Sequence, residues 1–274
     1  ACLAGSGGLR RRGRPLPAAD PVGLETAGGV TVKRILAQTA LEFGKLRGTG
    51  LWLVALLSSM AAIFLSLYLV VADQGTDYTF GIFAGNIISN TQSDLLPCTV
   101  AFLLGQMMER ERTCGTLKNL LAVPLTFRHL LAVKAAACAV MTLLYSVAQW
   151  TFALAAACAL DLPGLDAATA GRAFACITGS NLCVYLAVLP VAALGTRYAG
   201  GDAPATAFAL FYGFFGSMIS TRRWGVFYPT LAGSVLFPLE GAPQPGKAAC
   251  ALAALGLMTV LGVLLITNAR DHSR

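Results

Sequence analysis

The sequence predicts an all-α protein with six membrane-crossing helices. Apolar residues make up 56% of the 274-residue chain and charged residues only 12%, whereas charged residues make up about a quarter of a typical soluble domain. Several runs approach or exceed the roughly 20 apolar residues that a helix needs to cross a bilayer. The basic residues gather beside these runs, and this pattern sets orientation in a membrane rather than indicating a nucleic-acid partner.

The chain before the first span has two parts. Residues 1–30 are rich in Gly, Pro and Arg without apolar periodicity, so we expect them to be disordered. In residues 31–47 apolar side chains recur at three- and four-residue spacing opposite basic ones, which is typical of a helix lying in the membrane interface. A soluble helix would show the same pattern, but the span that begins four residues later favours the membrane. The residues that mark this interfacial helix are Lys33, Arg34, Ile35, Phe43 and Lys45.

The six spans follow from the apolar runs. They are predicted at residues 51–71, 87–108, 130–160, 173–194, 204–219 and 248–267, the fourth broken by Pro190. The second span joins a mixed segment to a short apolar one, and the fifth is short. Five spans is therefore the alternative, if the fifth does not cross. The connection at 220–247 is too broken to span, so we expect it to dip into or lie on the outer face, where its aromatic residues suit interfacial depth.

The distribution of Lys and Arg predicts the orientation. Eight basic residues precede the first span and five lie in residues 109–134, whereas the loop after the first span has none. The positive-inside rule therefore places both termini and the 109–134 stretch in the cytosol. Arg222, Arg223 and Lys247 are the exception, because they precede the last span on the outer side. Long loops follow the rule weakly, so this exception does not change the count of spans.

The polar stretch between the second and third spans reads ERERTCGTLKNLLAVPLTFRHLLAVK. Its two acidic residues, Glu109 and Glu111, are predicted at the start of a short helix, where the positive end of the helix dipole favours them. Leucines at three- and four-residue spacing then form an apolar face, and Pro124 ends the helix. A short amphipathic helix between two spans is suited to lie along the membrane face and bind a cytosolic partner. A plain surface loop accounts for the spacing equally well.

The sequence offers little for catalysis. Its two histidines are far apart, it has no CxxC pair, and its eight cysteines lie mostly in apolar runs, so we exclude a metal site. It has no GxxxxGK[ST] loop for ATP hydrolysis. Asp94 is the only acidic residue within a predicted span, which makes it a candidate intramembrane polar site. The four polar residues before it favour the alternative of a helix cap at the outer interface.

The order of these elements and one motif resemble the permease subunits of ABC-2-type transporters, most closely those of lantibiotic-immunity and bacitracin-resistance exporters. The motif is E-R-E-R-x-x-G-T-L-K-x-L-L-x-x-P, followed by R-H-L-L-x-x-K. The matching positions are Glu109, Glu111, Gly115, Thr116, Leu117, Leu120, Leu121, Pro124, Arg128 and Lys134. The resemblance covers residue 31 to the C-terminus, and residues 1–30 have no counterpart in it.

The resemblance implies that the interfacial helix and the stretch from Glu109 through Arg110 to Arg128 form the docking surface for a separate ABC ATPase subunit. That partner would bind ATP and Mg²⁺, and this chain would carry no cofactor. It also implies a homodimer or a pair of related permeases in membrane lipid, with the cargo path between them. An antimicrobial peptide or other amphipathic compound is the first expectation for cargo, and a drug, lipid or polysaccharide is the alternative. From other classes, a membrane sensor or scaffold without transport stays open, as does an intramembrane enzyme, which would need a polar cluster inside the spans.

Overall fold

The computed structural model describes Thr39, Gly44 and residues 50–72, 78–113, 127–239 and 241–269. Within these residues all regular structure is helical and there is no strand, which agrees with the predicted all-α class. The predicted interfacial helix falls almost entirely outside the described residues, and so does the centre of the polar stretch, residues 114–126.

Five described helices are long and apolar enough to cross a membrane. They are α2 (Leu51–Ala72), α6 (Phe127–Ala159), α7 (Ala167–Gly195), α8 (Asp202–Ser220) and α10 (Pro245–Thr267). The short fifth predicted span, α8, is one of these five. We expected Pro190 to break α7, but the helix continues through it to Gly195. Buried helices tolerate proline because neighbouring groups compensate for the lost backbone bond.

The predicted second span is part of a longer helical run. It consists of α3 (Phe80–Asn90), the π-helical segment η1 (Thr91–Leu95) and α4 (Leu96–Thr113). The run therefore begins before the predicted residue 87 and ends after residue 108. A π-helical turn inserts an extra residue into a helix and is frequent at functional sites. The charged residues at the end of α4 and the polar residues of η1 distinguish this run from the five apolar helices.

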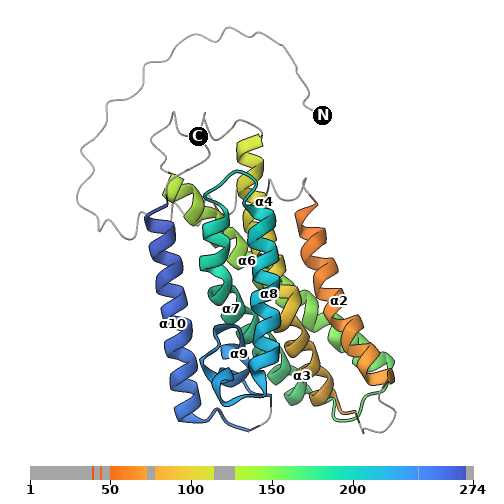
Figure 1. The fold of residues 1–274 in the computed structure, drawn as a ribbon. Coiled ribbons are helices and arrows are strands. Elements are labelled where there is room, and N and C mark those ends of the chain that lie inside the picture. The colour runs from red at the N-terminus through yellow and green to blue at the C-terminus, as the bar shows by residue number, and fades with distance from the viewer. Residues whose placement is uncertain are drawn as a thin grey trace, which may run out of the picture.

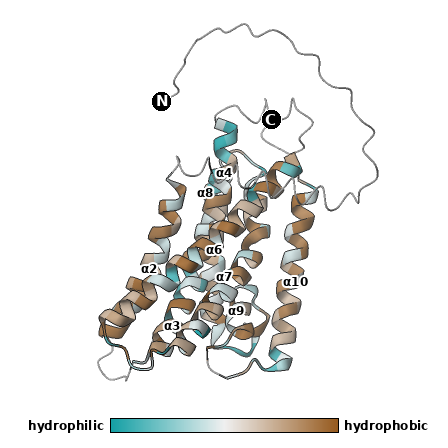
Figure 2. Cartoon of the chain, turned by 180° about the vertical axis from the view of Figure 1, so that it is seen from behind, coloured by the Kyte–Doolittle hydropathy of each residue, from teal (hydrophilic) through white to brown (hydrophobic). Residues whose placement is uncertain are grey.

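The helices form one bundle whose ends are easily told apart (Figure 1). We call the end that holds the start of α2, the end of α4 and the end of α10 the upper end, and the end that holds α9 the lower end. Helix α7 is the central element, and it packs against α4, α6, α8 and α10. The outward faces of α2, α8 and α10 carry exposed apolar side chains such as Leu57, Phe211 and Leu257. Figure 2 shows this hydrophobic colour along α2 and α10, and hydrophilic residues at the upper tip of α4.

The connection between α8 and α10 enters the bundle at its lower end. It forms η2 (Arg223–Phe227), η3 (Pro229–Leu231) and α9 (Ala232–Leu236). Thr230 and Ala232 have no exposed surface. A Cβ added to Gly233 would lie 2.5 Å from Cα of Ser180 on α7, so only glycine allows this close approach. The connection therefore folds back between the long helices and does not span the bundle.

Candidate functional site

The first two acidic residues of the polar stretch lie at the end of a helix and not at the start of one. Glu109 and Glu111 belong to the last turns of α4, which continues to Thr113. The end of a helix carries partial negative charge, so its dipole favours Arg110 and Arg112 and disfavours the two carboxylates. The prediction that the dipole stabilises these acidic residues is therefore wrong, and other contacts stabilise them: Glu109 contacts Arg112 and the α7–α8 loop, and Glu111 contacts α6.

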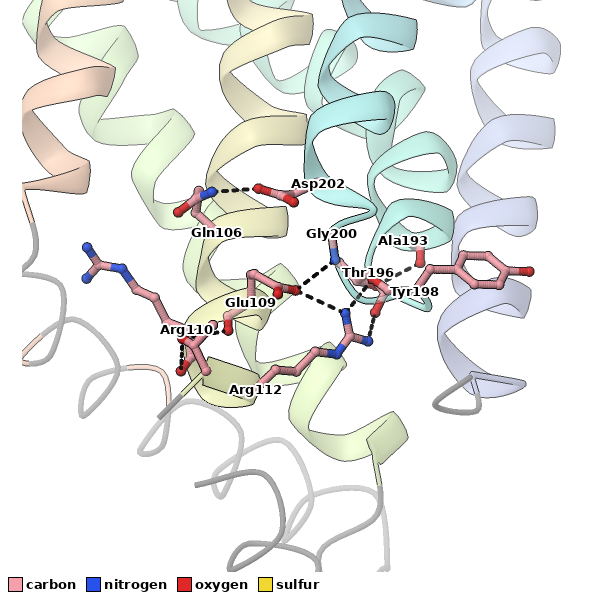
Figure 3. A network of polar contacts seen from close by, with 10 residues as sticks. Gln106, Glu109, Arg110, Arg112, Ala193, Thr196, Tyr198, Gly200 and Asp202 are labelled. Carbon is pink, nitrogen blue, oxygen red and sulfur yellow. Dashed lines mark hydrogen bonds and ion pairs between the residues drawn. The ribbon is translucent and has the colours of Figure 1, made fainter. Parts of the chain in front are cut away.

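Arg112 and Glu109 bind the loop between α7 and α8 (Figure 3). Nη2 of Arg112 donates a hydrogen bond to the carbonyl of Thr196 at 2.5 Å, and Nη1 donates to the carbonyl of Tyr198 at 2.6 Å. Oε2 of Glu109 lies 3.4 Å from Nη1 of Arg112 and accepts a hydrogen bond from the backbone N–H of Gly200 at 3.3 Å. Hydrogen bonds to charged groups are the stronger ones in proteins, so this loop is held firmly against α4.

A second contact lies about one turn earlier on α4. Nε2 of Gln106 donates a hydrogen bond to Oδ2 of Asp202, the first residue of α8, at 2.6 Å (Figure 3). A Cβ added to Gly105 would lie 2.5 Å from Cβ of Asp202, so the two helices touch there without a side chain between them. The end of α4, the end of α7 and the start of α8 are thus joined into one unit at the upper end.

Glu111 joins α4 to α6 through a buried ion pair. Its Oε1 lies 3.2 Å from Nζ of Lys134, and the two residues are 8% and 1% exposed. We expected Lys134 to extend to the membrane interface, but its ammonium group lies inside the bundle beside the Glu111 carboxylate. The reason is the register of α4, which turns Glu111 towards α6. The carboxylate of Glu111 therefore faces the interior, while Arg128 at the start of α6 is exposed.

The other residues of the predicted docking surface cannot be placed. The part from the polar stretch, Gly115, Thr116, Leu117, Leu120, Leu121 and Pro124, lies outside the described residues, as do Lys33, Arg34, Ile35, Phe43 and Lys45 of the interfacial helix. The structure does bring the charged end of α4 and the start of α6 to the same end of the bundle (Figure 1). The docking surface stays a prediction.

A chain of buried polar side chains crosses the interior of the bundle, and the sequence analysis missed it. Nε2 of Gln149 on α6 donates to Oγ1 of Thr91 in η1 at 2.6 Å. Nδ2 of Asn181 on α7 donates to Oε1 of Gln149 and to Oγ of Ser146, both at 3.0 Å. Such bonds between helices hold polar groups that lipid cannot solvate. Two amide side chains within long apolar runs were the signal that could have revealed this cluster.

Asp94 lies in η1, inside the helical run from α3 to α4. Helix extends on both sides of it, so the alternative of a helix cap at the outer interface is wrong. The side chain is half-buried, and no hydrogen bond or ion pair joins it to any other residue that the structure describes. Asp94 therefore remains a candidate intramembrane polar site, separate from the cluster at Gln149. In the described part of the chain, no three His, Cys, Asp or Glu side chains are grouped as metal ligands would be.

Residues 39–216 match the family model described as ABC-2 family transporter protein. The match extends from the segment before α2 into α8 and covers more than half of the chain. The chain belongs to the ABC-2 transporter family. It is accordingly a multi-pass membrane permease of an ABC transporter, and membership of this family implies an ABC ATPase as partner. No curated protein matched the chain.

Proposed function

We propose that this ABC-2 permease is the six-span membrane subunit of an ATP-driven exporter in a bacterial cell membrane. Five spans are the long apolar helices, and the sixth is the run from α3 through η1 to α4. The path of the chain supports this assignment, because α2 ends at the lower end and α6 begins at the upper end (Figure 1). The basic residues before α2 and in residues 109–134 favour an upper end in the cytosol, together with both termini.

The contacts at the end of α4 support a mechanism by which ATP hydrolysis is coupled to transport. An ATPase subunit binding at the upper end would displace the 109–134 stretch and, with it, the end of α4. Arg112 and Gln106 tie α4 to the α7–α8 loop and to Asp202, so α7 and α8 would move with α4. The π-helical segment η1 is the point at which α4 can bend relative to α3. Such a motion switches the helices between two arrangements.

The cargo we propose is an amphipathic compound, with an antimicrobial peptide as the first candidate, in line with the lantibiotic-immunity exporters that the motif resembles. The outward face of α8 supports an amphipathic cargo better than an ion, because its large exposed side chains are apolar and aromatic. The exposed aromatic face of α8, with Phe208, Phe211 and Phe215, suits a second permease across a cargo path. A drug, lipid or polysaccharide is the alternative cargo, and a sensor or scaffold is the alternative from another class.

Affinity purification from native membranes tests the proposal. An ABC ATPase should co-purify with the chain, and Arg128→Glu should weaken its recovery, because this exposed residue belongs to the proposed docking surface. Arg172→Glu is the matched control, since Arg172 is an exposed arginine near the lower end. Glu111→Lys is less suitable because it would also break the ion pair with Lys134. If no ATPase is recovered with the original chain or with any variant, the exporter proposal is wrong and a sensor or scaffold is favoured.

Comparing the susceptibility to antimicrobial peptides of cells with and without the permease then tests the cargo.

A further inference from the structure

A pocket of about 900 Å³ lies at the lower end of the bundle. It is formed by the end of α8, by η2, by α9 and by the start of α10. This volume is typical of small-molecule sites, which range from roughly 300 to 1,000 Å³. The pocket is remote from the contacts at the end of α4, so the coupling scheme above does not use it.

Three basic residues line this pocket. Arg222, Arg223 and Lys247 all belong to its wall and all are exposed. Among the residues that the structure describes, the wall contains no acidic side chain, and none of the three basic residues forms an ion pair there. Together with Arg172 they put basic residues at the lower end, where the positive-inside rule expects few in the proposed orientation. Orientation therefore does not account for the three pocket residues.

The two arginines are held by a tight turn against the end of α8. The backbone N–H of Arg222 donates to the carbonyl of Ile219 at 2.8 Å, and the N–H of Gly225 donates to the carbonyl of Arg222 at 3.0 Å. Gly225 is buried, and a Cβ added to it would lie 2.8 Å from the oxygen of Ile219. Lys247 projects from the first turn of α10 on the other side. The backbone that carries the charges is thus ordered before any ligand binds.

The remaining wall is partly apolar, and exposed aromatic side chains lie beside it. Val226, Phe227, Leu231 and Val235 contribute apolar surface to the pocket. Phe227 is 55% exposed beside Trp224, which is 74% exposed, and their ring centroids are 6.3 Å apart. Exposed Trp and other aromatic side chains near the ends of spans mark the level of the lipid headgroups. A ligand here would meet cations and an apolar surface at once.

We propose that this pocket binds the phosphate headgroup of an anionic, lipid-like amphiphile. The two guanidinium groups and the Lys247 ammonium group contact the phosphate, since arginine forks and lysine point charges both suit it. The side chains around Phe227 contact the first carbons of the apolar chains. Placement in the outer leaflet rests on the proposed orientation, whereas binding itself requires neither the ATPase nor the cargo. An absence of lipid binding would therefore leave the exporter proposal intact, and an absence of the ATPase would leave the lipid-binding proposal intact.

Native mass spectrometry of the purified full-length chain in detergent tests the proposal. The probes are phosphatidylglycerol, diacylglycerol as a lipid without phosphate, and inorganic phosphate. We expect phosphatidylglycerol to bind most tightly, and the triple variant Arg222→Gln, Arg223→Gln, Lys247→Gln to bind it at least about tenfold more weakly, because each basic residue near a lipid surface contributes severalfold. The charge-preserving variant Arg222→Lys, Arg223→Lys, Lys247→Arg is the matched control and should stay within about threefold of the original.

Three results would overturn the proposal. The first is unchanged phosphatidylglycerol binding by the glutamine variant. The second is an equal loss in the charge-preserving variant, because charge would then not be the determinant. The third is inorganic phosphate binding as tightly as the lipid, which would assign the pocket to a soluble anion. If the triple glutamine variant does not fold, Lys247→Gln alone changes one exposed side chain and should lower the affinity by about fivefold.

Discussion

Replacing Lys134 by Met is expected to destabilise the protein by about 3–5 kcal/mol, because the buried Glu111 carboxylate would lose the ammonium group beside it. The size follows from the geometry. At the 3.2 Å that separates Nζ and Oε1, an effective dielectric constant of about 20 gives an attraction of roughly 5 kcal/mol. Both residues are nearly inaccessible to solvent, so water does not replace the lost partner.

The double variant Glu111→Gln, Lys134→Met removes both charges and should lie within about 1–2 kcal/mol of the original, since a well-packed neutral pair often replaces a buried ion pair at little cost. The single and double variants form a cycle whose coupling energy should be at least roughly 2–3 kcal/mol in magnitude, and larger by whatever Glu111→Gln costs alone. Unfolding by SDS in detergent micelles, followed by tryptophan fluorescence, measures each free energy. Arg128→Gln is the control for losing an exposed charge on α6. A cost below about 1 kcal/mol for Lys134→Met, or strictly additive losses, would refute the argument that this pair joins α4 to α6.

Three further predictions follow from single contacts. Gly213→Ala should cost about 1–3 kcal/mol in the same unfolding assay, because its Cβ would collide with a backbone carbonyl of η1, whereas Gly256→Ala on α10 has open space and should cost nothing. Arg112→Gln should speed amide hydrogen exchange in the α7–α8 loop by about tenfold or more, because the carbonyls of Thr196 and Tyr198 lose a charged donor. Unchanged exchange would show that other contacts hold the loop. Hydrogen bonds from the side chain and the backbone N–H of Thr169 hold the pKa of Asp166 below its usual 3.8. The stabilisation of α7 by Asp166 is therefore present above about pH 4 and is lost as the pH falls through the pKa of the folded protein. Asp166→Asn should keep the cap at pH 7 and reduce this acid-induced loss of stability, measured by unfolding at several pH values.

The sequence predicted the long apolar helices well because lipid imposes their length and composition. The first span was expected at residues 51–71 and is α2, Leu51–Ala72; the last was expected to end at residue 267, where α10 ends. The run from α3 to α4 was predicted too short. Its asparagine, glutamine and threonine side chains look like loop residues in the sequence, but Asn90 donates a hydrogen bond to Ser66 on α2, and Thr91 accepts one from Gln149 on α6.

The motif drew attention to the charged residues around Glu109, but it did not predict that they lie at the end of α4 or which residues they contact. Arg112 binds carbonyls 84 and 86 residues further along the chain, and backbone carbonyls have no sequence signature. Lys134 was misplaced for a related reason, because an ordinary lysine near the start of a span gives no sign of a buried carboxylate facing it. Long apolar spans are visible in sequence patterns, whereas pairings between helices depend on tertiary packing.

The long sequence separations in the unit at the end of α4 also set an order of assembly. Glu111 and Lys134 are 23 residues apart, so their ion pair can form as soon as α6 enters the membrane. Gln106 is 96 residues from Asp202, and at a synthesis rate of about 5–20 residues per second its partner appears roughly 5 to 20 seconds later. Until α7 and α8 are inserted, Gln106 and Arg112 do not yet have the contacts with Asp202, Thr196 and Tyr198 that they make in the folded chain. The arrival of α7 and α8 supplies these contacts, so the surface that the ATPase is proposed to recognise is completed only after most of the chain has been inserted.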